Sequence, residues 1–135
     1  MESLPMNLQL EMVLRMLLAG GLSALIGWQR ERSHKPAGLR THILIGLGAA
    51  LFTIISINLA GGVTSQIAAG VVTGIGFLGA GTILHRTHAV EGLTTAASIW
   101  VVAAIGMAAG AGYYILAGAT ALVVFLVLWL RVALK

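Results

Sequence analysis

A stretch of 38 residues without a charged side chain, residues 93 to 130, constrains the fold more than any other part of the sequence. As one helix, at about 1.5 Å per residue, it would be about 57 Å long, whereas about 20 apolar residues suffice to cross a hydrocarbon core about 30 Å thick. The stretch therefore predicts two membrane spans, 93–110 and 113–130. We expect the break between Gly110 and Tyr114, where glycines loosen a helix and tyrosines suit the membrane interface.

The rest of the chain has the same apolar character. Of its 135 residues 59% are hydrophobic and 9% are charged, which excludes an ordinary soluble domain. Further apolar runs predict spans at 8–28, 41–59 and 67–84. The expected fold is all-α: one polytopic transmembrane domain over residues 1–135, with about five transmembrane helices and no soluble C-terminal domain. Since no signal-peptide pattern is visible, we expect the first span to remain in the mature protein.

Positive charge is distributed unevenly between the predicted loops. Basic residues follow the first, third and fifth spans, whereas the other two loops carry no charge. Because cytoplasmic loops are enriched in Lys and Arg, this alternation predicts an outside N-terminus and a cytoplasmic C-terminus. Within the first span, Glu11 and Arg15 are four residues apart and can meet on one helix face, either as an interfacial ion pair or as a functional intramembrane pair.

The sequence also contains a candidate internal repeat. At an offset of 54, ten residues are identical over 31 ungapped positions, and the shared pattern Arg-x-His followed by Gly-Leu-x-Thr is the least trivial part. The repeat predicts two parallel helical hairpins, spans one and two and spans three and four, with a fifth helix added. It pairs Arg32 with Arg86 and Thr41 with Thr95.

The loops of this repeat predict a cytoplasmic site for an anion or a partner protein. Cationic side chains gather next to the amino ends of spans two and four, where unpaired N–H groups and the helix dipole favour negative charge. Thr41 and Thr94 or Thr95 are expected to cap these helices. An ordinary topology signal with lipid-phosphate contact remains the alternative. The candidate site comprises Arg30, Glu31, Arg32, Lys35, Arg40, Thr41, Arg86, Thr94 and Thr95.

The third span is rich in glycine. Small residues let helix backbones approach closely, so we expect helix packing there, with a glycine-lined ion path as the alternative. The expected packing residues are Gly70, Gly74, Gly76, Gly79 and Gly81. His85 and His88 lack a third ligand at a diagnostic spacing. No metal, cofactor, catalytic set or nucleic-acid partner is therefore predicted.

Three motifs resemble the membrane domain of the MgtC/SapB family of bacterial inner-membrane proteins: "GLSALIGWQRERSHKPAGLRTH", "GVVTGIGFLGAGTIL" and "VEGLTTAASIWVVAAIG". The resemblance covers roughly residues 10 to 131. It implies five spans with an outside N-terminus, and roles in adaptation to low magnesium and in survival inside host cells (virulence). It also implies contacts with partner membrane proteins such as the F-type ATP synthase and magnesium-transporting P-type ATPases. Many members carry a soluble domain after the fifth span, whose function this chain would lack.

Together these features favour a non-enzymatic membrane regulator that acts through protein contacts in the bilayer and at the cytoplasmic face, with a homo-oligomer left open. A small transporter or channel, for magnesium or for an anion, is the alternative. Magnesium is usually held by carboxylates, and Glu11 is the only carboxylate within a predicted span. The repeat and the glycine-rich helix, in contrast, are common in transporters.

Overall fold

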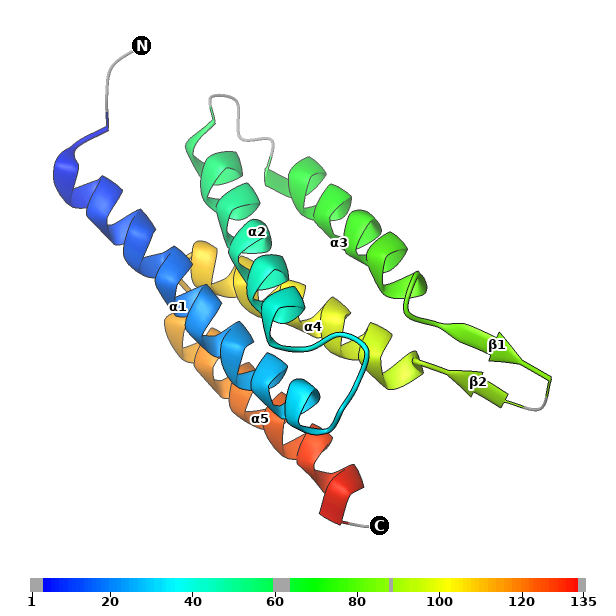
Figure 1. The fold of residues 1–135 in the computed structure, drawn as a ribbon. Coiled ribbons are helices and arrows are strands. Elements are labelled where there is room, and N and C mark those ends of the chain that lie inside the picture. The colour runs from blue at the N-terminus through cyan, green and yellow to red at the C-terminus, as the bar shows by residue number, and fades with distance from the viewer. Residues whose placement is uncertain (1–3, 60–63, 88, 134–135) are drawn as a thin grey trace.

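A computed structural model describes residues 4–59, 64–87 and 89–133, with the side chains of residue 86 and of residues 131–133 left out. Within these ranges it contains five helices and one short β-hairpin (Figure 1). The elements are α1 (Met6–Arg32), α2 (Leu39–Asn58), α3 (Thr64–Ala80), β1 (Leu84–Arg86), β2 (Ala89–Glu91), α4 (Leu93–Gly110) and α5 (Tyr114–Ala133).

Helix α4 is the centre of the bundle, because it packs against all four other helices. Helices α1 and α2 form a closely packed antiparallel pair, α5 covers α1 and α4, and α3 rests on α4 with a looser contact to α2. Figure 1 shows residues 33–38, the hairpin and the Ala133 end of α5 at one end of the bundle. The end of α2, the start of α3 and the α4–α5 turn lie at the other end. The loops that carry the basic residues are therefore on one side.

Local chemistry explains where the helices break. Helix α1 ends as His34 adopts a left-handed conformation (φ 57°), and Pro36 cannot continue a helix. Helix α4 ends as the Tyr113 N–H donates to the Ala108 carbonyl at 2.9 Å, with Gly112 at φ 89°. Helix α5 then begins at Tyr114, which confirms the break expected in this segment.

The outer surface of the bundle is apolar. Large hydrophobic side chains point outward from α2, α3 and α5, among them Leu44, Phe77 and Ile115, which is 89% exposed. Among the described residues three helices, α1, α2 and α4, are long and apolar enough to cross a membrane, while α3 and α5 are shorter apolar helices. The fold is thus that of the predicted all-α membrane protein.

Two expectations differ from the structure or stay open. The helix in the region of the third predicted span ends at Ala80 rather than at residue 84, because the chain turns at residues 81–82 and enters strand β1. Helices α1–α2 and α3–α4 are adjacent hairpins, as a repeat requires. Their loops differ, however: one is irregular and the other is a β-hairpin. The internal repeat therefore stays a prediction.

Candidate functional site

Arg30 is the innermost residue of the predicted basic site. It follows Ser23, Ile26 and Gly27 on the buried stripe of α1, at the three- and four-residue spacing of one helix face. Its side chain is only 3% exposed, and its Nη2 donates to the Thr95 Oγ1 of α4 over 2.6 Å. The structure thus joins two residues of the predicted set, but as a buried link between helices instead of a surface feature.

A second buried link lies beside it. The His42 ring is fully buried, and its Nδ1 donates to the Gly38 carbonyl at 2.8 Å, since a carbonyl can only accept. Its Nε2 lies 2.9 Å from the Oγ of Ser98, which also lies 2.7 Å from the Thr95 carbonyl. The two links together connect α1, α2 and α4 at the basic-loop end. No pattern in the sequence indicates that His42 and Ser98 belong to this cluster.

The other candidate residues remain near the surface. The Arg32 guanidinium lies over the Trp28 ring, 5.4 Å from its centroid, in cation–π geometry. Glu31, Arg40 and Thr41 are exposed, and Lys35 and Thr94 are half-buried. Arg86 lies in β1 opposite Ala89.

The expected threonine caps are not formed. Helix α2 begins at Leu39, two residues before the predicted start, and α4 begins at Leu93 as predicted, but glycine occupies each N-cap position, Gly38 for α2 and Gly92 for α4, without a side-chain cap. Thr41 and Thr95 lie inside the first helical turn. Thr41 is exposed, whereas Thr95 is 2% exposed and accepts the arginine hydrogen bond. The paired positions of the proposed repeat therefore have different environments.

The β1–β2 hairpin projects from the basic-loop end of the bundle (Figure 1). Its register pairs Leu84 with Glu91 and His85 with Val90. Leu84 is 49% and Val90 is 47% exposed, so about half of each residue's surface is left uncovered by the described part of the chain. Gly92 closes the hairpin at φ 90°, and a Cβ there would overlap the Thr82 carbonyl. The sequence predicts only a loop in this segment, because strands of three residues are too short to show alternation.

At the opposite end, the Glu11–Arg15 ion pair forms as expected, with 2.7 Å between Arg15 Nη2 and Glu11 Oε1. The structure adds partners that the sequence could not indicate. Arg15 Nε donates to the Tyr114 hydroxyl at 3.0 Å, and Nη1 donates to the Gly110 carbonyl at 3.1 Å. The pair thus fastens α1 to the turn between α4 and α5.

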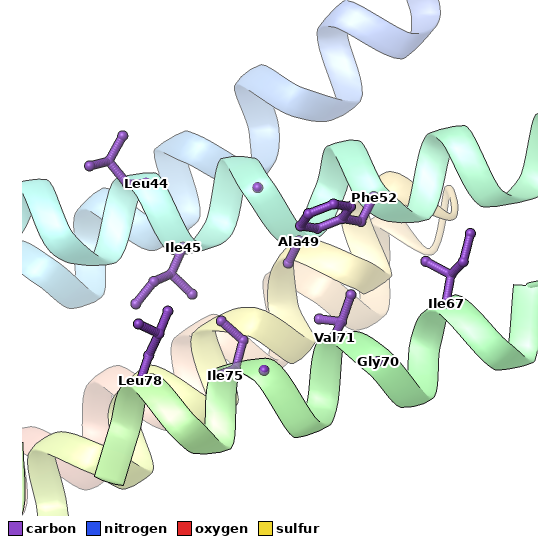
Figure 2. A pocket seen from close by; sticks show the side chains of 11 residues that line it. Leu44, Ile45, Ala49, Phe52, Ile67, Gly70, Val71, Ile75 and Leu78 are labelled. Atoms are coloured by element: carbon purple, nitrogen blue, oxygen red, sulfur yellow. The ribbon is translucent and has the colours of Figure 1, made fainter. Parts of the chain in front are cut away.

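Helices α2 and α3 enclose an apolar groove of about 700 Å³ (Figure 2). Ile45 of α2 points across it toward Ile75 and Leu78 of α3. The lining residues are Leu44, Ile45, Gly48, Ala49, Phe52, Ile67, Gly70, Val71, Gly74, Ile75 and Leu78. Every side chain on this list is apolar.

The glycines of α3 do not make the close helix contacts that were expected. A Cβ added at Gly70, Gly74 or Gly76 would meet no described atom within 4 Å, because α3 lies at the edge of the bundle. Of the predicted packing residues only Gly79 lies close to another helix: a Cβ added there would be 3.4 Å from the Ala96 carbonyl oxygen of α4. A Cβ at Gly81 would meet only Leu78, 3.2 Å away in the preceding turn.

The tight contacts lie instead at glycines of α1, α2 and α4. A Cβ at Gly27 would come within 2.9 Å of the His42 Cβ, and one at Gly46 would overlap Ser23. A Cβ at Gly106 would overlap the Gly46 carbonyl. These glycines let the central helices pack backbone to backbone.

Similarity to known proteins assigns this bundle to a family. The MgtC family matches residues 16–135. This chain belongs to the MgtC family. It is 50% identical over 113 residues to a protein of Escherichia coli K12 with the name "Putative magnesium transporter YhiD", covering 77% of this chain and 53% of that protein.

Other relatives are similar over comparable lengths. Protein SrpB of Synechococcus elongatus is 41% identical over 126 residues, which cover 82% of this chain and 69% of that protein. Protein MgtC of Brucella abortus is 47% identical over 98 residues, which cover 70% of this chain and 41% of that protein. The chain spans about half the length of the Escherichia coli relative. No solved structure matches the chain.

Within the described residues of this MgtC-family chain, no three His, Cys, Asp or Glu residues lie close enough together to hold a metal ion. The polar side chains that link different helices form two main clusters among those residues. One is the buried cluster of Arg30, His42, Thr95 and Ser98, and the other is the Glu11–Arg15–Tyr114 network.

Proposed function

We propose that this chain is the membrane domain of a non-enzymatic regulator that acts in adaptation to low magnesium or to intracellular stress by contacting partner membrane proteins. The observation that carries the proposal is the β1–β2 hairpin, which extends from the bundle with Leu84 and Val90 exposed. A two-stranded hairpin alone is marginally stable in water, and its edges offer unpaired backbone groups. A partner surface that packs on the hairpin would stabilise it and pair its free backbone groups.

The positive charge at the basic-loop end favours a partner with an acidic surface. The chain has a net charge of +4, and the hairpin lies at the same end as the basic residues of the first loop. Arg32 and Arg40 are exposed there. An acidic cytoplasmic surface would therefore be attracted to this end and held less strongly as the salt concentration rises.

The class of partner comes from the MgtC/SapB resemblance. We place the chain in the bacterial inner membrane, with its N-terminus outside and its C-terminus in the cytoplasm. The F-type ATP synthase and magnesium-transporting P-type ATPases are the proposed partners, on the basis of this resemblance. The hairpin and the basic loop would face the cytoplasmic surface of such a partner directly.

Crosslinking to bacterial membrane proteins tests the proposal. The chain has no cysteine, so in the purified chain a single replacement is the one position that a thiol-directed photocrosslinker labels, and the labelled chain is then reconstituted with solubilised bacterial membranes. Val90→Cys on the hairpin is compared with Val127→Cys on α5, which is similarly exposed at 57%. We expect a discrete crosslinked protein from the Val90 position and only lipid adducts from the Val127 position. Equal protein crosslinking at both positions, or none at Val90, would contradict the proposal.

Growth at low magnesium provides the functional readout. Val90→Glu places a negative charge on the hairpin, where it repels an acidic partner surface, and should abolish the growth advantage that the chain gives. The matched Val127→Thr change on the lipid-facing side should leave growth unchanged. If Val90→Glu grows like the original chain, the hairpin is not the contact surface.

Transport is the second candidate function, and the printed name of the Escherichia coli relative favours it. Flux into liposomes that contain only this chain separates the two candidates. Regulation predicts no magnesium or anion flux above that of empty liposomes. Saturable, ion-specific flux would favour transport.

A further inference from the structure

The α2–α3 groove has features that the partner contacts of the hairpin do not explain. Its walls are entirely apolar, and its floor contains Gly48, Gly70 and Gly74, which leave the helix backbones uncovered. No described atom lies within 4 Å of the position that a Cβ would take on any of these three glycines. The space beside them is therefore large enough for a further apolar group.

One end of the groove carries positive charge. Thr41 precedes Leu44 and Ile45 by three and four residues, so it lies on the groove face of α2, one turn closer to the basic loop. Arg40 lies beside Thr41 and four residues before Leu44. Both Arg40 and Thr41 are exposed. Helical spacing thus places Arg40 and Thr41 one turn beyond the lining residues of α2, at the basic-loop end of the groove.

The length of the groove matches one leaflet of a membrane. The wall residues of α2, Leu44 to Phe52, cover about 12 Å of helix, and those of α3, Ile67 to Leu78, cover about 16 Å. Half of a hydrocarbon core is about 15 Å thick. A partner helix that crosses the membrane would need about twice this length, so the groove suits a lipid chain better than a spanning helix.

We propose that the α2–α3 groove binds one acyl chain of an anionic phospholipid from the leaflet next to the basic loops, with the lipid phosphate held by Arg40 and Thr41. Arginine pairs with phosphate through two parallel N–H donors, and the threonine hydroxyl supplies a third. The acyl chain lies over Gly48 and Gly74, where the exposed backbones let it approach closely. The bound lipid fills the space between α3 and α2.

The same glycines provide variants that fill the groove without disturbing the fold. A leucine at Gly74 projects into the groove, whereas a leucine at Gly76, on the same helix but outside the lining, also meets open space. Gly76→Leu is therefore the matched control for Gly74→Leu. At the entrance, Arg40→Gln removes the charge, and Arg32→Gln is its control because Arg32 lies over Trp28 instead.

Native mass spectrometry of the full chain measures the binding. Phosphatidylglycerol and phosphatidylcholine with identical acyl chains are titrated separately. We expect one tightly retained phosphatidylglycerol on the original chain, a loss of about fivefold in its affinity in Arg40→Gln, and a loss of about tenfold for both lipids in Gly74→Leu, because leucine displaces several methylene groups. Both control variants should bind like the original chain.

Three outcomes would overturn the proposal. One is unchanged phosphatidylglycerol binding in Gly74→Leu, and another is an equal effect of Arg40→Gln and Arg32→Gln. The third is a dimer of the original chain that Gly74→Leu dissociates while lipid binding persists, which would assign the groove to a second copy. If Gly74→Leu does not fold, Gly48→Leu fills the groove from the opposite wall and is judged by the same criteria.

Discussion

Replacing Gly106 with alanine tests the central contact of the bundle, where α4 meets α2. The added Cβ would overlap the Gly46 carbonyl oxygen and would lie 3.1 Å from the Ala49 Cβ, whereas ordinary contact begins at 3.4 Å. Relief requires a separation of the two helices by up to roughly 1 Å. Overpacking of this kind costs about 1–3 kcal/mol, and the better helix propensity of alanine returns about 0.5–1 kcal/mol.

We therefore expect Gly106→Ala to lower the free energy of unfolding by about 1–2 kcal/mol, or the melting temperature by roughly 4–8 °C. Gly48→Ala is the matched control on α2, because its Cβ meets no described atom within 4 Å. It should gain about 0.5–1 kcal/mol. Thermal unfolding in detergent, followed by circular dichroism, measures both. If Gly106→Ala proved as stable as Gly48→Ala, α2 and α4 would not pack backbone to backbone.

Three further predictions concern polar contacts and topology. Thr95→Val removes the buried acceptor of the arginine hydrogen bond and should cost about 1.5–3 kcal/mol in the same melting assay, whereas Thr41→Val, at an exposed position, should be nearly neutral; equal losses would contradict a buried link. Glu11→Gln should lower the melting temperature less than Thr95→Val, because solvent screens its partly exposed pair. Cysteines at Ser33 and Thr64 should react with impermeant thiol reagents only from the cytoplasm and only from outside, respectively; labelling from one common side would exclude the five-span topology.

Features that depend on nearby residues were predictable from the sequence. The break between α4 and α5 follows from Gly112 and the tyrosines after it, and the Glu11–Arg15 pair follows from a four-residue spacing. The apolar runs that predict the five helices likewise needed no tertiary information. The side of the bundle on which the basic loops lie follows from the number of helices.

Features that depend on how helices cross were not predictable. The glycine content of α3 suggested close packing, but only the arrangement of the helices shows that Gly74 faces a groove while Gly46 and Gly106 face each other. The inward direction of Arg30 has the same origin, because its acceptor Thr95 lies 65 residues away in sequence. A charge pattern gives the membrane side of a residue, not its depth in the bundle.

The central place of α4 has a consequence for the order in which this protein is assembled. Arg30 emerges from the ribosome 65 residues before Thr95, an interval of about 3–13 s at a synthesis rate of about 5–20 residues per second. During that time α2 and α3 are synthesised, but α4, the helix that joins them to α1, is not yet complete. Until α4 is inserted, the Arg30 guanidinium must therefore be solvated by lipid headgroups, water or an insertion factor instead of by Thr95.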